Sequence, residues 1–280
     1  MAAFDLEGKT IVITGASSGI GRALAVEFAD KGAGHVVISG RNTGALDETA
    51  QLVKQKGIEP VCFAADVTSQ DEMHALVNEA LEKTGGLHAM VLCAGYEIMG
   101  AAENLDVDAY RRQMETNFFG VLHGFYAALP HFLEQGRGEF VFFNSAVGKL
   151  AAGLNSAYCA SKFALTGFTD SIRCEMALHN INVLGVYPGF VKTNFQKNIE
   201  SPDCNVPDDL ARKLMGQTPE HVAKKVVKAC CKRKGELIFT FSANLGIRLA
   251  PLSFYMTEFA RAKIALPYFG TLVGHKGAGG

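Results

Sequence analysis

The sequence lacks the features that mark several large classes of protein. Its net charge is only −1 at neutral pH, so no general attraction to nucleic acid is expected. Seven cysteines are present, but they form no C-x-x-C pair and their number is odd. We therefore interpret them as reduced thiols of a cytoplasmic protein, mostly in the core. The eight histidines contain no H-E-x-x-H motif, so no metal site is expected.

Long apolar segments are also missing. No run of 18 apolar residues exists, so a membrane-spanning helix is not predicted. The first ten residues contain Asp5 and Glu7 and no apolar stretch, which argues against a signal peptide. The 280 residues, 48% of them hydrophobic, are enough for one large α/β domain. We expect this domain to span residues 1–273 and residues 274–280 to be a disordered tail.

Apolar, β-rich segments alternate with amphipathic helical segments along the chain. Strands that are buried on both faces of a parallel sheet read as continuous apolar runs, and that is the pattern here. The alternation predicts an α/β fold with a doubly wound parallel sheet flanked by helices. The expected strands are 10–15, 35–40, 61–67, 88–95, 138–145, 181–189 and 235–241, and the expected helices are 21–32, 44–56, 70–84, 106–134, 156–179 and 218–235.

The first expected strand runs into TGASSGIG, whose glycines Gly15, Gly19 and Gly21 follow the pattern G-x-x-x-G-x-G. Glycine lets the backbone turn tightly and approach a pyrophosphate at a helix N-terminus, where free N–H groups and the helix dipole favour anions. The loop therefore predicts a dinucleotide site. The alternative is a tight turn without a ligand, and the flanking strand and helix make this the weaker interpretation.

The ends of the next strands carry further candidates. The second strand ends at Gly40 and Arg41, without the carboxylate that would hold a ribose 2′-hydroxyl, and an arginine there can pair with a 2′-phosphate. Arg41 could instead be an ordinary surface residue. Two residue pairs close the third and fourth strands, at the edge where such sheets bind ligands: Asp66 with Val67, and Ala94 with Gly95.

A tyrosine and a lysine one helical turn apart, Tyr158 and Lys162, begin the helix after the fifth strand, and Ser145 ends that strand. All three should converge on the ligand-binding edge of the sheet. A phenol with an ordinary pKa of about 10 is a poor proton shuttle at neutral pH, but a cation one turn away would lower that pKa. Asn117 lies within an expected helix and needs hydrogen-bond partners if it is buried.

Together these motifs resemble the short-chain dehydrogenase/reductase family. The resemblance covers about residues 8–240 and rests on TGASSGIG, CAG at 93–95, Asn117, Ser145, Tyr158-x-x-x-Lys162 and YPGFVKT at 187–193. It implies one Rossmann-type domain and an oxidoreductase that interconverts a ketone and a secondary alcohol by hydride transfer.

The resemblance implies a role for each matching position. Tyr158 would be the general acid/base, Lys162 would lower its pKa and bind the nicotinamide ribose, and Ser145 would polarise the carbonyl. Asn117 would hold a water that relays protons from Lys162. Arg41 lies where NADP-preferring members place a phosphate-binding arginine, so the expected cofactor is NADP(H). The other expected cofactor contacts are Gly15, Ser17, Ser18, Gly19, Ile20, Gly21, Asp66, Val67, Ala94, Gly95, Pro188, Gly189, Val191 and Thr193.

Two positions depart from the family pattern. Cys93 stands where members usually have asparagine, which weakens a structural hydrogen bond, and Asn144 precedes Ser145 where many have serine. Neither change removes a catalytic group. The alternative from another class is a catalytically inactive sensor or scaffold that binds the cofactor. A serine hydrolase is a poorer alternative, because Ser145 does not lie in a G-x-S-x-G elbow.

The helices that hold Asn117 and Tyr158 carry more apolar residues than the sheet can cover. Family members commonly pair through these helices, so a homodimer or homotetramer is expected, although the same side chains could simply be core. They are Phe118, Phe119, Val121, Leu122 and Phe125.

The region after Thr193 bears on the substrate. By its position in the family, about residues 190–217 form a substrate lid. About residues 242–273 add an apolar extension that Arg248 and Pro251 interrupt. This extension either packs on the protein or a partner subunit, or rests on lipid as a peripheral membrane contact. The chain is in this respect similar to lipid-handling members, including 3-ketosphinganine reductases and steroid or retinoid reductases, so we expect a bulky apolar carbonyl substrate.

Overall fold

The structure is a computed structural model that describes residues 3–193, 199–200 and 216–239. Most of the expected lid, at 194–198 and 201–215, lies outside the described residues. The expected apolar extension at about 242–273 and the expected tail at 274–280 lie outside them as well.

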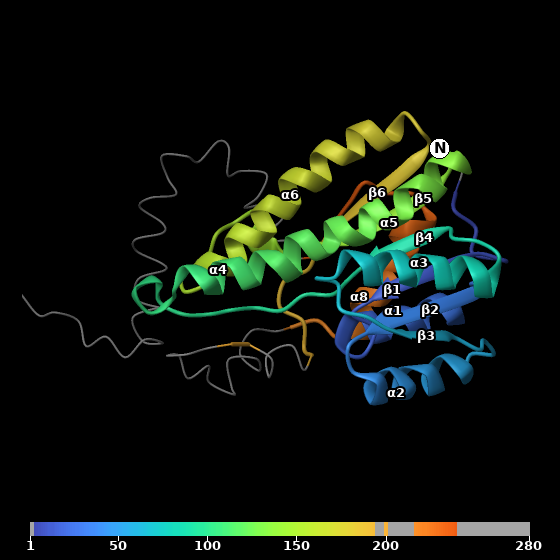
Figure 1. Ribbon diagram of the computed structural model, residues 1–280, viewed down its shortest axis with the longest axis horizontal. Coiled ribbons are helices and arrows are strands. Elements are labelled where there is room, and N and C mark those ends of the chain that lie inside the picture. Colours follow the sequence, from blue (N-terminus) through green and yellow to red (C-terminus); the bar gives the residue numbers. More distant parts are fainter. Residues whose placement is uncertain (1–2, 194–198, 201–215, 240–280) are drawn as a thin grey trace, which may run out of the picture.

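Seven strands of the described residues form one parallel sheet, in the order β3-β2-β1-β4-β5-β6-β7 (Figure 1). The chain moves outward from β1 to β3 and then returns to add β4 on the other side of β1. Such a reversal of strand order places the connecting helices on both faces. The sheet is therefore doubly wound, as the alternating pattern predicted. Its strands are β1 (Thr10–Thr14), β2 (His35–Gly40), β3 (Val61–Ala64), β4 (Ala89–Leu92), β5 (Gly138–Phe143), β6 (Ile181–Tyr187) and β7 (Glu236–Ile238).

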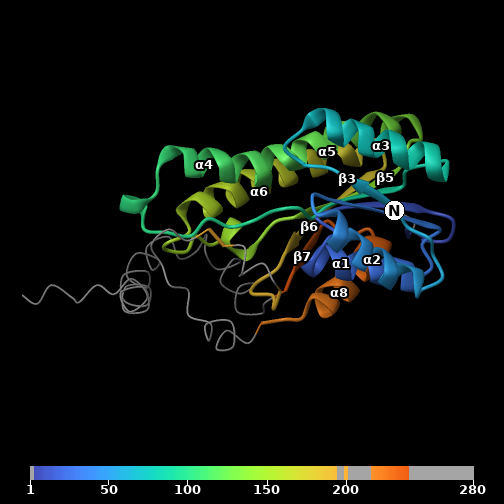
Figure 2. The ribbon, with the colours of Figure 1, turned by 60° about the horizontal axis from the view of Figure 1, so that its bottom comes forward.

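Helices cover the two faces of the sheet as separate layers (Figure 2). On one face α1, α2 and α8 pack over the strands, with Leu24, Phe28 and Val226 in a single buried cluster. On the other face lie α3, α5 and α6, where Phe125 and Phe140 belong to a second cluster. The helices are α1 (Gly19–Asp30), α2 (Thr43–Lys54), α3 (Gln70–Thr84), α4 (Val107–Met114), α5 (Gly120–Glu134), α6 (Ser156–Ala177) and α8 (Pro219–Cys231).

Side-chain caps determine where several helices begin. Asn42, Ser69, Asp106 and Thr218 each accept a hydrogen bond from a backbone N–H group in the first turn of α2, α3, α4 and α8. α8 is shorter than the helix expected at 218–235, because the chain leaves the helical conformation at Arg233, whose φ is +50°.

The long helix expected at 106–134 is interrupted in the middle. α4 passes into a π-helical turn at Glu115–Phe119, and α5 begins directly after it. A π-helical turn inserts one extra residue into a helix and occurs frequently at functional sites. Here the turn contains the fully buried Asn117.

Several strands end earlier than their apolar runs. β3 ends at Ala64 and β4 at Leu92. Beyond Ala65, which still donates its N–H to the Gly40 carbonyl oxygen at 3.3 Å, and beyond Leu92, the backbone bonds to side chains. The N–H of Asp66 donates to a Glu72 carboxylate oxygen at 2.8 Å, and the N–H of Cys93 donates to the Thr14 hydroxyl at 3.2 Å. The residues predicted to close these strands therefore lie in loops just past the carboxyl edge of the sheet.

A buried ion pair ties the last described strand to the sheet. The Arg233 Nε atom, just before β7, lies 2.7 Å from a carboxylate oxygen of Glu139 in β5, and both side chains are almost fully buried. Burial raises the pKa of Glu139 to about 7, although Arg233 opposes this rise. Pairs of this kind add little net stability, but loss of one partner leaves the other charge buried alone. The pair therefore favours the arrangement in which the residues just before β7 lie against β5.

The cysteines divide between the core and the surface. The six that the structure describes are free thiols. Cys159 and Cys230 are buried, in agreement with the expected core role, whereas Cys62 and Cys174 are exposed. Core packing therefore does not explain the two exposed thiols. Cys204 lies outside the described residues.

Candidate active site

The loops that follow the strands meet at one edge of the sheet because the strands are parallel and in register. Thr14 at the end of β1 pairs with Ser39 in β2 and with Leu92 in β4. Phe143 at the end of β5 pairs with Val186 in β6. The glycine loop, the loop after β4 and the loop after β5 therefore leave the sheet at the same level.

The glycine loop joins β1 to the first turn of α1 and leaves no room for side chains. Gly15 has a φ of +68°, and a Cβ atom there would lie 2.8 Å from the backbone of Ala94. A Cβ atom on Gly21 would lie 2.2 Å from the Gly15 carbonyl oxygen. The Ser18 side chain makes no capping hydrogen bond, so the first N–H groups of α1 have no partner inside the helix. The loop can hold an anion such as a pyrophosphate.

Two side chains support this loop from below. The Arg22 guanidinium donates to the Ser17 carbonyl oxygen at 2.6 Å and to Thr49 on α2 at 3.0 Å. The Thr14 hydroxyl accepts the N–H groups of Cys93 and Ala94, at 3.2 and 3.4 Å. These bonds connect the glycine loop to the start of the loop after β4, where Ala94 and Gly95 were predicted. Ile20 packs against the core below the loop.

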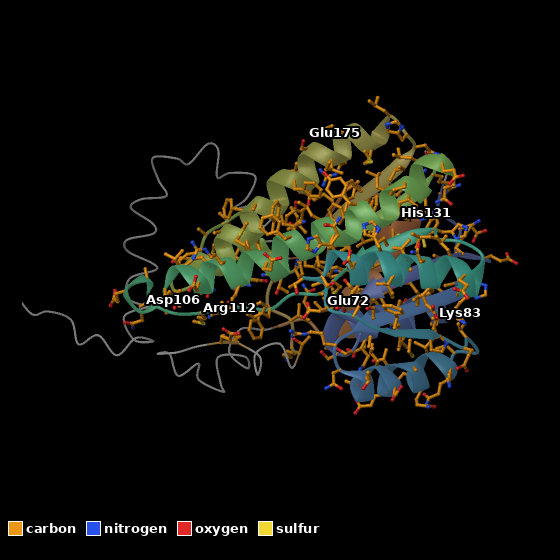
Figure 3. All side chains as sticks on the ribbon, viewed as in Figure 1. Glu72, Lys83, Asp106, Arg112, His131 and Glu175 are labelled. Carbon is orange, nitrogen blue, oxygen red and sulfur yellow. The ribbon has the colours of Figure 1, made fainter. Side chains whose placement is uncertain are left out.

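Arg41 lies just past β2 with its side chain 79% exposed, and one guanidinium nitrogen is 3.6 Å from an Asp66 carboxylate oxygen. A surface pair of this kind holds its members weakly. Asp66 itself is fixed, since it accepts hydrogen bonds from Thr68, and Glu72 in the first turn of α3 accepts its N–H (Figure 3). Val67 is nearly buried beside Gly120. Arg41 and Asp66 thus lie together, as the strand ends predicted.

The loop after β6 approaches the glycine loop. The Pro188 carbonyl oxygen accepts the Ala146 N–H at 2.9 Å, which links this loop to the one after β5. Gly189 is half-buried, and Val191 forms a parallel bridge with Gln217. A Cβ atom on Gly19 would lie 3.3 Å from the Thr193 methyl group, so Thr193 covers the start of α1.

Ser145, Tyr158 and Lys162 meet above the end of β5. The Lys162 ammonium donates to the Phe143 carbonyl oxygen at 2.8 Å and lies 5.7 Å from the centre of the Tyr158 ring. A hydrogen bond joins the side chains of Ser145 and Tyr158. The structure therefore brings together the three residues that the sequence singled out, on a buried strand end and the first two turns of α6.

Asn117 reaches the same place from the π-helical turn. Its side-chain oxygen accepts the Tyr96 N–H at 3.1 Å, and its side-chain nitrogen donates to the Tyr96 carbonyl at 3.0 Å and to Ser161 at 3.2 Å. A Cβ atom on Gly95 would lie 3.0 Å from the Asn117 oxygen and 3.8 Å from the Lys162 nitrogen. Asn117 and Lys162 thus border the same small space, which only a glycine leaves open.

Burial shifts each ionisable group in this site toward its neutral form. It lowers the pKa of Lys162 to about 8. The pKa of Tyr158 is raised well above its usual value, first by burial and then by the nearby Glu97 carboxylate, while the hydrogen bond to Ser145 partly offsets this rise. This direction is opposite to the lowering that we expected from Lys162. The protein by itself therefore keeps the phenol protonated, ready to donate.

The sequence reasoning missed Glu97. This carboxyl group lies two residues past Gly95 and near the Asn155 side chain. Burial raises the pKa of Glu97 to about 7, while Asn155 and Lys162 oppose the rise. The available signal was an acidic residue among apolar neighbours just after a strand at the ligand-binding edge.

A glycine loop at the head of α1 and a tyrosine–lysine pair above the end of β5, at the same edge of the sheet, are typical of a Rossmann-type dinucleotide-binding oxidoreductase. The sequence profile of the short chain dehydrogenase family matches residues 9–203. The chain belongs to this family, as its motifs indicated, and is an oxidoreductase that acts on CH–OH groups with a nicotinamide cofactor.

Several relatives cover most of the chain. Dehydrogenase/reductase SDR family member 7B of Xenopus tropicalis is 33% identical, over 92% of this chain and 87% of that protein. The 3-ketodihydrosphingosine reductase of Bos taurus is 32% identical, over 80% of this chain and 68% of that protein. A solved short chain dehydrogenase/reductase from Burkholderia phymatum, in complex with NAD, is 25% identical with a TM-score of 0.82, over 90% of this chain and 96% of that one.

The raised pKa of Glu97 predicts a pH-dependent stability. Its value of about 7 in the folded protein exceeds the ordinary 4.5, so the folded state binds this proton more tightly and loses stability as the pH rises between the two values. Glu97→Gln removes the loss. The variant should gain stability over the wild type by on the order of 2 kcal/mol between about pH 4.5 and about pH 8.5.

Urea unfolding at several pH values measures this difference. Glu103→Gln is the control, because it removes a carboxylate from an exposed position in the same loop. A stability difference between Glu97→Gln and the wild type that stays constant with pH would contradict the prediction.

Proposed function

We propose that the protein interconverts a ketone and a secondary alcohol with NADP(H), and that its substrate is bulky and apolar. The observation that best supports this proposal is that Ser145, Tyr158 and Lys162 converge at the carboxyl edge of the sheet, within reach of the loop that can hold a dinucleotide. The residues fit a nicotinamide cofactor, because Gly15 and Gly21 leave the backbone open beside the first turn of α1.

Four side chains form the proposed catalytic tetrad: Asn117, Ser145, Tyr158 and Lys162. Each has a task that its surroundings support. A bound nicotinamide supplies hydride transfer at its C4 carbon. Tyr158, held protonated by burial, gives its proton to the carbonyl oxygen during reduction and takes it back during oxidation. The Ser145 side chain is hydrogen-bonded to the Tyr158 side chain. A substrate carbonyl oxygen placed beside them would therefore accept hydrogen bonds from both hydroxyl groups.

Lys162 returns a proton to Tyr158, and Asn117 helps to hold the relay between them. The ammonium of Lys162 is held by the Phe143 carbonyl, and its pKa of about 8 lets it release and regain a proton near neutral pH. Asn117 keeps the turn at Tyr96 fixed through two hydrogen bonds and borders the space beside Lys162. A water in that space would complete the relay. Lys162 would also bind the nicotinamide ribose.

The preference for NADP(H) rests on the end of β2. Gly40 offers no carboxylate to a ribose 2′-hydroxyl, and a Cβ atom there would lie 3.3 Å from the Ser17 hydroxyl. Arg41 is exposed and only weakly held by Asp66, so it can turn to a 2′-phosphate at little cost. The Burkholderia phymatum relative holds NAD, so the proposal depends on these residues and not on the family.

The proposed substrate class rests on the relatives and on the composition of the C-terminal region. One relative is a 3-ketodihydrosphingosine reductase, whose name describes a long-chain keto lipid. Residues 242–273 of this chain are unusually apolar. No helix in the described ranges is both long and apolar enough to cross a bilayer. We therefore propose a cytoplasmic enzyme that touches membranes peripherally through its C-terminal region.

We also propose that copies of the chain pair through α5 and α6, which lie on the same face of the sheet (Figures 1 and 2). Val121 and Phe125 are buried and belong to the core, so only part of the predicted apolar set is available for contact. The large apolar side chains exposed on these helices are Tyr126, Leu133 and Phe163, and Phe119 is exposed at the end of the π-helical turn just before α5.

The first prediction concerns catalysis. Tyr158→Phe keeps the ring but removes the donated proton, so kcat should fall at least about 100-fold while NADPH binding is retained. Turnover of ketones is followed by the loss of nicotinamide absorbance. Tyr110→Phe, which removes a phenol from α4, is the control. Wild-type turnover in Tyr158→Phe would refute the mechanism, and NADPH binding by the wild type without turnover of any ketone would favour a sensor.

The second prediction concerns the choice of cofactor. Arg41→Ala should weaken NADPH binding by roughly 1.5–3 kcal/mol, the range for a charge-assisted hydrogen bond, and leave NADH binding nearly unchanged. Fluorescence titration with each cofactor gives the two affinities. Arg111→Ala removes another exposed arginine that has an acidic partner and should affect neither. An equal loss for both cofactors would show that Arg41 does not read the phosphate.

The third prediction concerns the substrate. Long-chain 3-keto lipids or steroids should give a higher kcat/KM than short hydrophilic ketones, and the protein should sediment with liposomes. If the short ketones are the better substrates and the protein stays in the supernatant, the proposed substrate class is wrong.

The fourth prediction concerns assembly. Light scattering at about micromolar concentration should give the mass of a dimer or tetramer, and Phe163→Asp should lower it, because a charge cannot be buried unpaired in an apolar interface. A wild-type protein that is monomeric in this measurement has no such interface.

A further inference from the structure

A cavity lies at the amino edge of the sheet, opposite the edge that holds the tetrad. Its walls come from the segment before β1, the end of α1 and one side of α8, and its volume is about 790 Å³. Each of these segments leads into the start of a strand, and α1 and α8 share one face of the sheet (Figure 2). Ligand pockets commonly have volumes of roughly 300–1,000 Å³. The cavity is thus large enough for a small molecule and separate from the proposed active site.

The floor of this cavity is apolar and held in place. Three almost fully buried side chains form it: Phe4, Leu6 and Val227. The Phe4 N–H donates to the Cys231 carbonyl oxygen at 2.8 Å, which ties the segment before β1 to the end of α8. The Arg137 side chain donates to the carbonyl oxygen of the residue before Phe4, also at 2.8 Å. The floor is therefore formed without a ligand, and it favours an apolar chain over a polar one.

The rim of the cavity on α8 is basic. Lys224, Lys228 and Lys232 follow one another at intervals of four residues, so they project from one side of the helix. All three are exposed and line the cavity. Among the residues that the structure describes, none of these lysines forms an ion pair with a carboxylate. The rim therefore carries three positive charges that the surrounding described residues do not neutralise.

The lysine at the end of α1 differs from those of α8. Lys31 lies 3.2 Å from an Asp30 carboxylate oxygen, so its charge has a partner within the protein. Like charges one turn apart lower the stability of a helix, and no such partner relieves the repulsion along α8. The dipole of α8 favours Lys228 and Lys232, which lie in and just after its last turn, but it does not account for Lys224. An anion from outside would complement all three.

Two carboxylates also line the cavity, and they do not balance its lysines. Glu27 is nearly buried and lies 3.8 Å from the Lys31 ammonium. Asp5 is exposed, and its side chain accepts the Glu7 N–H at 3.3 Å. Because four lysines face these two carboxylates, the lining has a net positive charge. The cavity therefore combines an apolar floor with a rim that attracts anions.

We propose that this cavity binds a single-chain amphiphile with an anionic head group, such as the anion of a fatty acid. The floor takes the apolar chain, and the ammonium groups of Lys224 and Lys228 hold the head group. Lysine acts as a point charge on a flexible stem, so it suits a carboxylate without a fixed geometry. The occupant is a free amphiphile and not a membrane, because the apolar side chains lie almost fully buried below the lysines, where a flat surface does not reach.

Calorimetry with three probes tests the two parts of the site. The probes are decanoate, butyrate, which has the head group on a short chain, and decanol, which has the chain without the charge. Each is used below the concentration at which it aggregates. The wild type should bind decanoate at least about 10-fold more tightly than either of the others. Equal binding of decanoate and decanol, or of decanoate and butyrate, would overturn the proposal.

Two matched double variants assign the binding to the cavity. Lys224→Gln with Lys228→Gln removes two charges from the rim and should weaken decanoate binding at least about 10-fold. Lys225→Gln with Lys234→Gln removes two exposed charges that do not line the cavity and should leave binding nearly unchanged. Melting temperatures without ligand report separately any effect on α8. An equal loss in both variants would indicate attraction to overall charge, and unchanged binding in the first would place the ligand elsewhere. Either result contradicts the proposed site.

Removal of a carboxylate gives the opposite test. Asp5→Asn removes the exposed negative charge at the cavity and keeps an oxygen that can accept the Glu7 N–H. Decanoate binding should therefore tighten by about 2- to 5-fold. Glu7→Gln is the control, since it removes an exposed charge two residues away that does not line the cavity, and its effect should be smaller. No gain in Asp5→Asn, or the same gain in both variants, would count against the site.

Sedimentation with liposomes distinguishes a free amphiphile from a membrane surface. Vesicles of phosphatidylcholine, with and without phosphatidylglycerol, are mixed with the wild type and with the variant that lacks the charges of Lys224 and Lys228. Both proteins should sediment to the same extent with each kind of vesicle. A loss in the variant that requires phosphatidylglycerol would show that the rim contacts anionic membranes instead, and the proposal would then be wrong.

Discussion

Parallel strand pairing is the constraint on which the rest of the structure depends. Strands that run in one direction and in register end at one level, as Thr14, Ser39 and Leu92 do. The loops after them have to leave the sheet together. Groups far apart in the chain, such as Gly15, Arg41 and Lys162, therefore lie at one edge of the sheet. Strand register brings them there, and no direct contact between them is needed. The helices on both faces only need to cover the sheet to keep that edge in place.

Desolvation then determines the electrostatics of the edge. Lys162, Glu97 and Tyr158 are partly or fully removed from water, and the pKa of each moves toward the neutral form. A cluster of neutral donors and acceptors responds strongly to any charge that enters it, because the local dielectric constant is low. The ionisation of the proposed site is thus set by its ligands as much as by its own residues, which suits a site that has to move a proton only when it is loaded.

The residues to which we assign the chemistry lie on the sheet edge and the helices around it: the glycine loop, the tyrosine–lysine pair and the asparagine in the π-helical turn. Arg41 after β2 and Glu97 after β4 lie at loop positions beyond the strand ends, where the sheet does not dictate the side chain. Either of these two charged residues can therefore change without disturbing the sheet.

Much of the fold and the outline of the site followed from local properties of the sequence. Continuous apolar runs identified all seven strands, and the spacing of Tyr158 and Lys162 placed both on one helical face. Gly15 and Gly21 were predictable because backbone crowding there tolerates no Cβ atom. These features depend on neighbours in sequence or on a general rule of parallel sheets, so one chain is enough to reveal them.

Other features were decided only when distant segments packed together. In the π-helical turn, the Asn117 side chain binds the backbone of Tyr96, a contact that no helical sequence pattern contains. Arg233 and Glu139, 94 positions apart in the chain, form a buried ion pair. β3 and β4 end where backbone N–H groups begin to bond to side chains. The direction of the Tyr158 pKa also depends on burial and on Glu97, a neighbour 61 positions away. Local sequence determined which elements form, whereas dehydration and side-chain partners, which are properties of the assembled edge, decided where some of those elements end and what charges the edge carries.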